Sequence, residues 1–366
     1  MRNIIQATDT GGAGTAHHFQ RSGLVKVAQT VGFQCLYWDT NLKNAPPAFD
    51  VFDEMDCPDG LIFIGQGYNL TPAIIKCIEE RKDNILVALR CSDYSPFTDK
   101  IDKNYYQILH AQEQEIKNVL KVREIINDDS RFFIFNHYTD TFMKITHEYW
   151  IKKYGVRACS DKLACDIFLY CNGKLDKDLM CGASIITSFH PYKNIGFDSY
   201  IRPMLFPVGE TPIKLWSSWG TSGAQYCGML PPQKNRDVYK SSLVNMSIAE
   251  PHARRFHFDL VERPYAVLGG GNFCVSDYSD SLKDVFDEDE LILAKTPKEF
   301  QDAVKHYIRY PDERLPFMER GKKTIINGHT YFHRFSQLLN NFTGHMENEV
   351  DRTMIVYDLV KNKMKL

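Results

Sequence analysis

The sequence has no Cys-x-x-Cys pair, although it contains ten cysteines scattered through apolar runs. Such pairs are the usual mark of structural zinc sites and dithiol redox centres, so neither kind of site is favoured. In a chain of this length without an export signal, the thiols are expected to be reduced and mostly buried.

Long hydrophobic runs are also missing. No segment approaches the roughly 18 to 20 apolar residues that a membrane helix needs, and the apolar run near Met1 is too short for a signal peptide. We therefore expect a cytoplasmic protein without a membrane span.

Neither sign of charge is in excess. Lys and Arg total 44 against 46 for Asp and Glu, so the formal net charge is -2. No global field draws the chain to nucleic acid or anionic lipid, although a local basic patch is compatible with this balance. The acidic run at 287–290 lies in a polar turn region, which favours a solvated loop, and we expect no metal site.

A chain of 366 residues exceeds the usual size of one hydrophobic core, so two domains are expected. In the first half, strand patterns alternate with helix patterns, which is typical of a doubly wound parallel α/β sheet. The alternation breaks at the polar turn 171–177. The predicted strands lie at 3–7, 33–38, 60–65, 84–90 and 131–135, and the predicted helices at 16–31, 71–81, 111–127 and 141–154.

The second half repeats the alternation less clearly, and residues 190–224 resist assignment. We expect domains at 1–170 and 171–342, with a C-terminal helix in 343–366 that packs back on the first domain. The predicted strands are 183–188, 242–247 and 272–276, and the predicted helices are 235–241, 297–309, 313–327 and 331–341.

Three consecutive glycines, Gly269, Gly270 and Gly271, stand between a helix-like run and a strand-like run. Glycine adopts positive φ freely and lets a backbone approach a ligand, so these N–H groups are candidates for binding a phosphate. The alternative is a helix that ends at glycine and a buried strand that follows it.

Four segments of the second half resemble the group 1 type glycosyltransferases, most of all the branch of the spore-maturation protein CgeB. They match the patterns Y-x-G-x-x-P, R-x-F-E-A-x-A-x-G-G-x-x-x-x-D, Y-L-x-x-P-x-x-R and H-T-Y-x-x-R. The resembling stretch covers roughly residues 226–340, and the segments lie at 226–245, 263–277, 299–314 and 329–334.

This resemblance implies a GT-B architecture, in which two Rossmann-like domains face each other across a cleft. It implies a nucleotide-diphosphate sugar, with a UDP-sugar favoured, held mainly by the second domain, and a hydroxyl acceptor held mainly by the first. No cofactor beyond this co-substrate is expected. The acceptor stays open among a glycan, a small molecule, a protein and a modified DNA base.

One position departs from the family pattern. The glutamate that binds the donor ribose in the family falls on Ala266, whose methyl group accepts no hydrogen bond. Glu262 lies one helical turn earlier and is the candidate replacement. Arg263, the three glycines and Asn272 complete the expected donor site, with Arg263 neutralising the departing diphosphate. His329 and Arg334 match the family's last motif.

In the first domain, Gly12 belongs to a glycine loop that precedes two histidines, His17 and His18. This loop follows the first strand, where open α/β sheets bind ligands, so Gly12 is expected to contact the donor. Imidazole titrates near neutral pH, which makes either histidine a candidate base. Asp93 and His137 follow later strands at equivalent positions and are the other catalytic candidates.

Two other functions remain open. Loss of the family glutamate at Ala266 is compatible with a catalytically weakened protein that only binds a nucleotide or glycan. A nicotinamide-dependent oxidoreductase is disfavoured, because the glycines at 11, 12 and 14 do not complete a G-x-G-x-x-G fingerprint.

Overall fold

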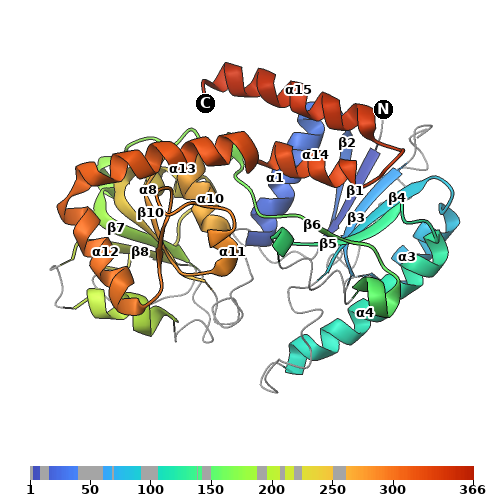
Figure 1. Ribbon diagram of the computed structural model, residues 1–366, viewed down its shortest axis with the longest axis horizontal. Helices are drawn as coiled ribbons and strands as arrows, with labels where there is room; N and C mark the ends of the chain where they lie inside the picture. The colour runs from blue at the N-terminus through green and yellow to red at the C-terminus, as the bar shows by residue number, and fades with distance from the viewer. Residues whose placement is uncertain are drawn as a thin grey trace. The chain divides into compact units, whose positions relative to one another are not determined.

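The computed structural model divides the chain into two compact units. The first consists chiefly of residues 21–162 and Phe332–Lys365, and the second chiefly of Leu163–Tyr331. Figure 1 shows a sheet within each unit. The structure describes residues 3–8, 16–39, 61–67, 70–91, 106–137, 139–141, 150–187, 196–206, 211–217, 225–249 and 261–366.

The first unit is built on a six-stranded sheet in the order β2-β1-β3-β4-β5-β6, and every pairing is parallel. Parallel strands buried on both faces are rich in apolar residues, as β3, β4 and β5 are here. The strands are β1 (Asn3–Thr8), β2 (Gln34–Asp39), β3 (Leu61–Gln66), β4 (Ile85–Arg90), β5 (Phe132–Asn136) and β6 (Ala158–Ser160).

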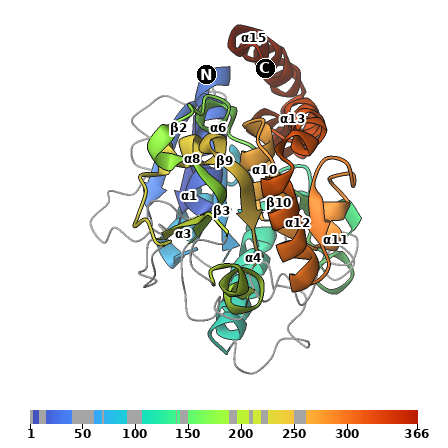
Figure 2. The same cartoon turned by 90° about the vertical axis from the view of Figure 1, so that its left-hand side faces the viewer.

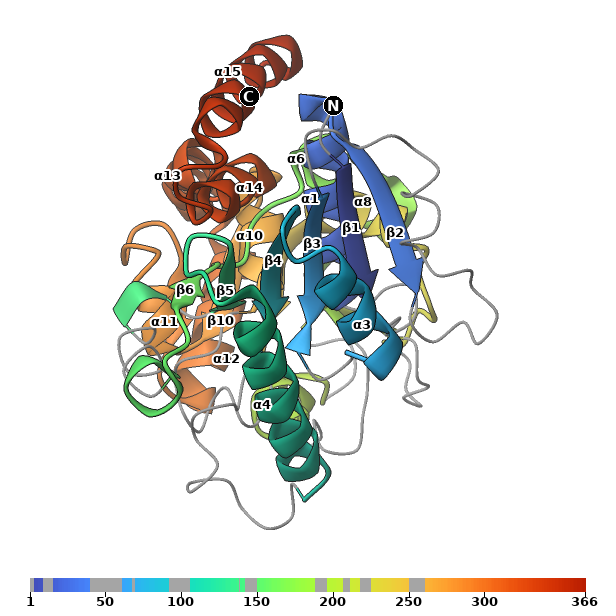
Figure 3. The same cartoon turned by 90° about the vertical axis from the view of Figure 1, so that its right-hand side faces the viewer.

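Helices connect these strands. α3 begins where the Thr71 hydroxyl accepts a hydrogen bond from the Ile74 N–H at 3.3 Å, with Pro72 in the first helical position. Figure 3 shows α3 and α4 side by side in front of the sheet. The helices are α1 (Ala16–Val31), α3 (Pro72–Glu80) and α4 (Tyr106–Ile126).

The last two helices, α14 (Tyr331–Asn340) and α15 (Glu347–Met364), pack within the first unit apart from Tyr331. The ring of Phe342 lies 4.8 Å from that of Phe133 on β5. α14 and α15 contact each other through Phe332 and Tyr357, whose ring centroids are 5.2 Å apart. The end of the chain therefore contributes to the core of the unit in which the chain begins.

The second unit has a five-stranded parallel sheet in the order β11-β10-β9-β7-β8. Figure 2 shows α12 beside β10. One face of the sheet packs on α12 through Phe300 and Val304, and the other face packs on α10. The strands are β7 (Cys181–Thr187), β8 (Ile213–Ser217), β9 (Ser242–Ser247), β10 (Cys274–Asp277) and β11 (Ile292–Ala294).

The helices of this unit begin with a short turn, α6, at the point where the chain enters the unit. α12 starts at Thr296, whose hydroxyl accepts from the Glu299 N–H at 3.1 Å, and Pro297 follows. The helices are α6 (Ile167–Tyr170), α8 (Asn235–Ser241), α10 (Glu262–Gly269), α11 (Asp280–Lys283), α12 (Pro297–Arg309) and α13 (Leu315–Gly328).

Both sheets share one topology. Numbered within its own unit, each sheet has the strand order second, first, third, fourth, fifth, and the first sheet adds a sixth. Open sheets of this type bind ligands at the carboxyl ends of the strands where the order reverses. In the first sheet this switch point lies between β1 and β3, and in the second between β7 and β9.

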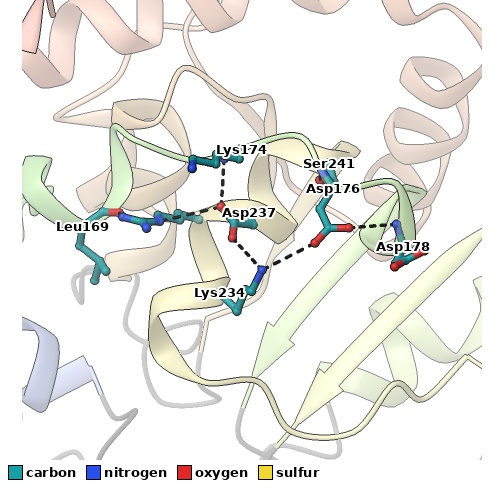
Figure 4. Close-up of polar contacts among 8 residues, drawn as sticks. Leu169, Lys174, Asp176, Asp178, Lys234, Asp237 and Ser241 are labelled. Carbon is teal, nitrogen blue, oxygen red and sulfur yellow. Dashed lines mark hydrogen bonds and ion pairs between the residues drawn. The ribbon is translucent and has the colours of Figure 1, made fainter.

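The polar turn after α6 is attached to α8 (Figure 4). The Lys174 N–H donates to the Asp237 carboxylate at 2.9 Å, and the Asp176 N–H donates to the Ser241 hydroxyl at 2.9 Å. Lys234 lies between the two carboxylates, 3.6 Å from Asp176 and 3.3 Å from Asp237. The turn thus belongs to the second unit, and the units divide earlier, at Lys162 and Leu163.

The sequence also indicated a strand in 226–232, where the structure has only an isolated bridge between Tyr226 and Leu215. The other eight predicted strands are confirmed in existence and approximate position, and the structure adds three that the sequence did not indicate. These three, β6, β8 and β11, have three to five residues each, too few to show a pattern of their own. Among the described helices, none combines the length and the apolar composition that a bilayer crossing requires.

Candidate functional site

Arg263 lies at the switch point of the second sheet. Its Nη2 donates to the carbonyl oxygen of Ile186 at 2.7 Å, near the carboxyl end of β7. The guanidinium also opposes the effect of burial on Tyr239, whose pKa burial raises to about 12. Nη1 of Arg263 is buried and has no hydrogen-bond partner in the described structure. One N–H group of a fixed cation is therefore left to bind a ligand.

Glu262, the first residue of α10, is buried as well. Burial raises the pKa of its carboxyl well above the usual range, the charge of Asp166 raises it further, and Arg263 opposes both. Asp166 itself is held by the N–H groups of Phe168 and Leu169. The raised pKa favours the protonated form of Glu262, in which a carboxyl can both donate and accept a hydrogen bond.

The glycine turn ends a helix. Gly271 has a φ of +67°, and its N–H donates to the carbonyl of Leu268 at 2.8 Å. The N–H of Gly270 donates to Ala266 at 3.2 Å, and that of Asn272 to Val267 at 3.1 Å. The turn belongs to the negative end of the α10 dipole, which disfavours an anion. The alternative interpretation, a helix that ends at glycine, therefore accounts for this turn. For these N–H groups to bind a phosphate, their existing hydrogen bonds would have to break.

Close packing accounts for the other two glycines. A Cβ atom on Gly269 would lie 2.4 Å from the Cys165 sulfur, and one on Gly270 would lie 3.0 Å from the carbonyl oxygen of Tyr170. Ala266, at the position of the family glutamate, is buried in the same apolar cluster as Cys165 and Tyr170. This part of α10 has small residues because the segment around α6 packs against it.

In the first unit, the structure brings His137 against Asp161. The two residues follow β5 and β6, and Nδ1 of His137 lies 2.7 Å from the carbonyl oxygen of Asp161. A carbonyl only accepts, so Nδ1 carries the proton and Nε2 holds the lone pair of the neutral ring. Both residues are buried. The carboxyl ends of β5 and β6 thus hold a histidine of defined tautomer.

The Asp161 side chain is itself perturbed. Burial raises its pKa to about 7, while the charges of Arg334 and then Arg90 oppose this rise. Arg90 ends β4, and Arg334 comes from α14 and is almost completely buried. The arginine of the last sequence motif therefore lies close enough to an acid of the first unit to offset part of the effect of its burial.

The remaining candidates are described only in part. His17 and His18 lie in the first turn of α1, but their side chains lie outside the described residues, as do Gly12 and Asp93. His329 belongs to the second unit, where its ring lies 5.9 Å from that of Tyr265. Within the described ranges, no group of three or more acidic, histidine or cysteine side chains has the arrangement of a metal site.

Two polar residues of the second sheet were missed by the sequence reasoning. Ser247 ends β9, Ser276 lies next to the end of β10, and the two are paired in the sheet. Both hydroxyls are buried without a hydrogen-bond partner in the described structure. Their position near the ends of predicted strands is the same signal that singled out His137. Asp161 had no such signal, because β6 is too short to be predicted.

Residues 201–340 match a family model described as "Glycosyl transferase-like". Among the curated proteins, none matches this sequence. Many solved structures share the fold, however. Sucrose-phosphate synthase from Thermosynechococcus elongatus is 9% identical, with a TM-score of 0.61, and the alignment covers 92% of this chain and 97% of that one.

Two further structural neighbours were solved with nucleotides. An α-glucosyltransferase in complex with UDP is 11% identical over 94% of this chain and 100% of that one, with a TM-score of 0.62. An α-glucosyltransferase was also solved with UDP and a 13-mer DNA containing a HMU base. T4 phage BGT with its UDP-glucose substrate is 13% identical over 100% of both chains, with a TM-score of 0.52.

Together these similarities show a GT-B fold made of two Rossmann-like domains, as the sequence predicted. They also show that the chain carries a glycosyltransferase domain, which includes α10 and its Arg263.

Proposed function

We propose that this chain, a glycosyltransferase of GT-B fold, moves a sugar from a uridine diphosphate sugar to a hydroxyl acceptor. The observation that carries the proposal is the placement of Arg263 at the switch point of the second sheet, within the glycosyltransferase-like match. The structural neighbours solved with UDP and UDP-glucose support the choice of nucleotide. We also propose that this chain belongs to the CgeB-like branch of these enzymes.

In this account the second domain holds the donor. Arg263 neutralises the diphosphate as it leaves, which a fixed cation does without a metal ion. Glu262 accepts a hydrogen bond from a ribose hydroxyl, in place of the family glutamate whose position Ala266 occupies. Gly269–Gly271 shape the end of α10, and Asn272 follows them. No cofactor beyond the donor itself is required.

The first domain holds the acceptor. We assign the base to its carboxyl edge, where Nε2 of His137 carries the lone pair. His17, His18 and Asp93 remain candidates on the same edge, with Gly12 near the donor. The acceptor is a glycan, a small molecule, a protein or a modified DNA base. DNA is of interest because one structural neighbour was solved with it.

A protein that binds the nucleotide without transferring sugar is the second candidate, and Ala266 favours it. A thermal-shift comparison tests which class of nucleotide the protein binds, because both candidate functions require a uridine nucleotide. UDP and UDP-glucose should raise the unfolding temperature, because a ligand that binds only the folded state stabilises it. NAD should not. Stabilisation by NAD alone would contradict the proposal.

A further inference from the structure

Four buried polar atoms near the start of α10 lack a hydrogen-bond partner within the described residues. They are the hydroxyl oxygens of Ser247 and Ser276, Nη1 of Arg263 and Oε1 of Glu262. Buried polar groups are nearly always hydrogen-bonded, so several unsatisfied groups in one region indicate a partner that binds there.

The two serines lie on the same face of the sheet. Ser247 and Ser276 are partners in the parallel pairing of β9 and β10, and side chains alternate along a strand. Asn245 and Cys274 therefore share their face. The charge of Arg263 lowers the raised pKa of Cys274, which indicates that the guanidinium lies near this face too. The two serine hydroxyls and the Arg263 guanidinium thus lie on one side of the sheet near its carboxyl edge.

A neighbouring serine, Ser184, shows how a hydroxyl on this sheet is hydrogen-bonded when it has a partner. Ser184 on β7 donates to the Asn245 side chain at 2.9 Å. The amide of Asn245 in turn donates to the carbonyls of Tyr239 and Phe273, both at 3.1 Å. Toward the amino end the buried polar groups therefore satisfy one another. Among the serines of this sheet face that the structure describes, Ser247 and Ser276, the pair toward the carboxyl edge, have unused hydroxyls.

The unused groups are mainly donors. Two are hydroxyls and one is a guanidinium N–H, whereas the fourth is a carboxyl oxygen of Glu262. The nearby carboxylate of Asp277 is engaged, because both its oxygens accept the Ala249 N–H, at 2.9 and 3.1 Å. Convergent donors, one of them cationic, match an oxyanion better than a neutral ligand or a metal ion.

We propose that Ser247 and Ser276, together with Arg263, bind oxygens of the donor's diphosphate and so position the leaving group. This inference rests on the proposed function and adds two residues to it. A hydroxyl is suited to the task because it donates without adding charge, and its strength grows toward a charged acceptor.

The test compares Ser247→Ala and Ser276→Ala with Ser184→Ala as the matched control. Calorimetry should show that each of the first two variants binds UDP about tenfold more weakly and binds uridine as wild type does. Neither should unfold at a lower temperature without ligand, because the lost hydroxyl has no partner. Ser184→Ala should show the reverse, with lower stability and an unchanged ratio of UDP to uridine affinity.

Inorganic pyrophosphate separates this inference from the proposed function. It should stabilise the wild-type protein, and it should stabilise the two serine variants less. If pyrophosphate binds and UDP does not, the oxyanion site stands while the uridine donor is refuted. Wild-type affinity for UDP in both variants, or an absence of any response to UDP and pyrophosphate, would overturn the inference.

Discussion

At the scale of single residues, Arg263 and Asp161 link the candidate sites to the stability of the fold. Each side chain is charged or titratable, and each lies near the carboxyl edge of its own sheet. The sequence identified Arg263 through its motif, but only the structure shows that one side of its guanidinium is bound to Ile186. That bond fixes the cation, so changes at Arg263 affect both ligand binding and folding.

Replacement of Arg263 by alanine should weaken UDP binding by about 2 kcal/mol, roughly 30-fold, and leave uridine binding nearly unchanged. A charge-assisted bond to phosphate is lost, whereas the nucleoside offers no phosphate. Titration calorimetry measures both affinities. Arg320→Ala is the control, since Arg320 forms an exposed pair with Asp289 at 2.9 Å. Equal losses for UDP and uridine would mean that Arg263 acts only on the structure.

Asp161 predicts a dependence of stability on pH. Its folded-state pKa is about 7, against 3.8 for the ordinary carboxyl, because burial disfavours the charge. Between these pH values the folded protein keeps a proton that the unfolded chain has lost. Its contribution to the unfolding free energy is therefore full below about pH 4 and is lost by about pH 7, at most on the order of 4 kcal/mol.

Asp161→Asn should remove this contribution, so the variant loses less stability than wild type between pH 4 and pH 7. Denaturant unfolding at several pH values measures the difference. Identical pH dependence in the two proteins would show that the carboxyl is not buried in its neutral form.

At the scale of elements, α10 shows that a local sequence pattern predicts a helix and its end but not the packing around them. The sequence indicated a helix that stops at Gly269–Gly271, and the structure confirms this. The phosphate interpretation came from the conformational freedom of glycine alone. It did not foresee that Cys165 and Tyr170 pack against the same residues, because contacts between distant segments leave no trace in a local pattern.

Two glycines at helix ends make a matched test of this packing. Gly269→Ala should lower the unfolding free energy by about 1 to 3 kcal/mol, because the new Cβ would lie 2.4 Å from the Cys165 sulfur. Gly328 ends α13, and a Cβ there meets nothing within 4 Å. Gly328→Ala should be neutral or stabilising by about 0.5 to 1 kcal/mol. Urea unfolding compares them, and a similar effect at both positions would refute the packing account.

At the scale of the whole molecule, the alternation of strands and helices was sufficient to predict a parallel α/β fold in two parts. The alternation could not predict the strand order, because hydrophobic periodicity does not indicate which strands are neighbours in the sheet. The position of a polar residue at the sheet edge was predictable where it follows a long strand, as His137 follows β5. The edge position of Asp161 was not predictable, because it follows a strand of only three residues. The burial of Glu262 was not predictable either, because it depends on the packing of α6.

The central claim is that the chain transfers sugar and does not merely bind a nucleotide. The most direct measurement is the release of UDP from a UDP-sugar over time, with water as the default acceptor, for wild type and Arg263→Ala. The account predicts slow but continuous release by wild type and a rate at least tenfold lower for the variant. UDP that binds tightly to wild type while no UDP-sugar is ever cleaved would contradict it and identify a binding protein.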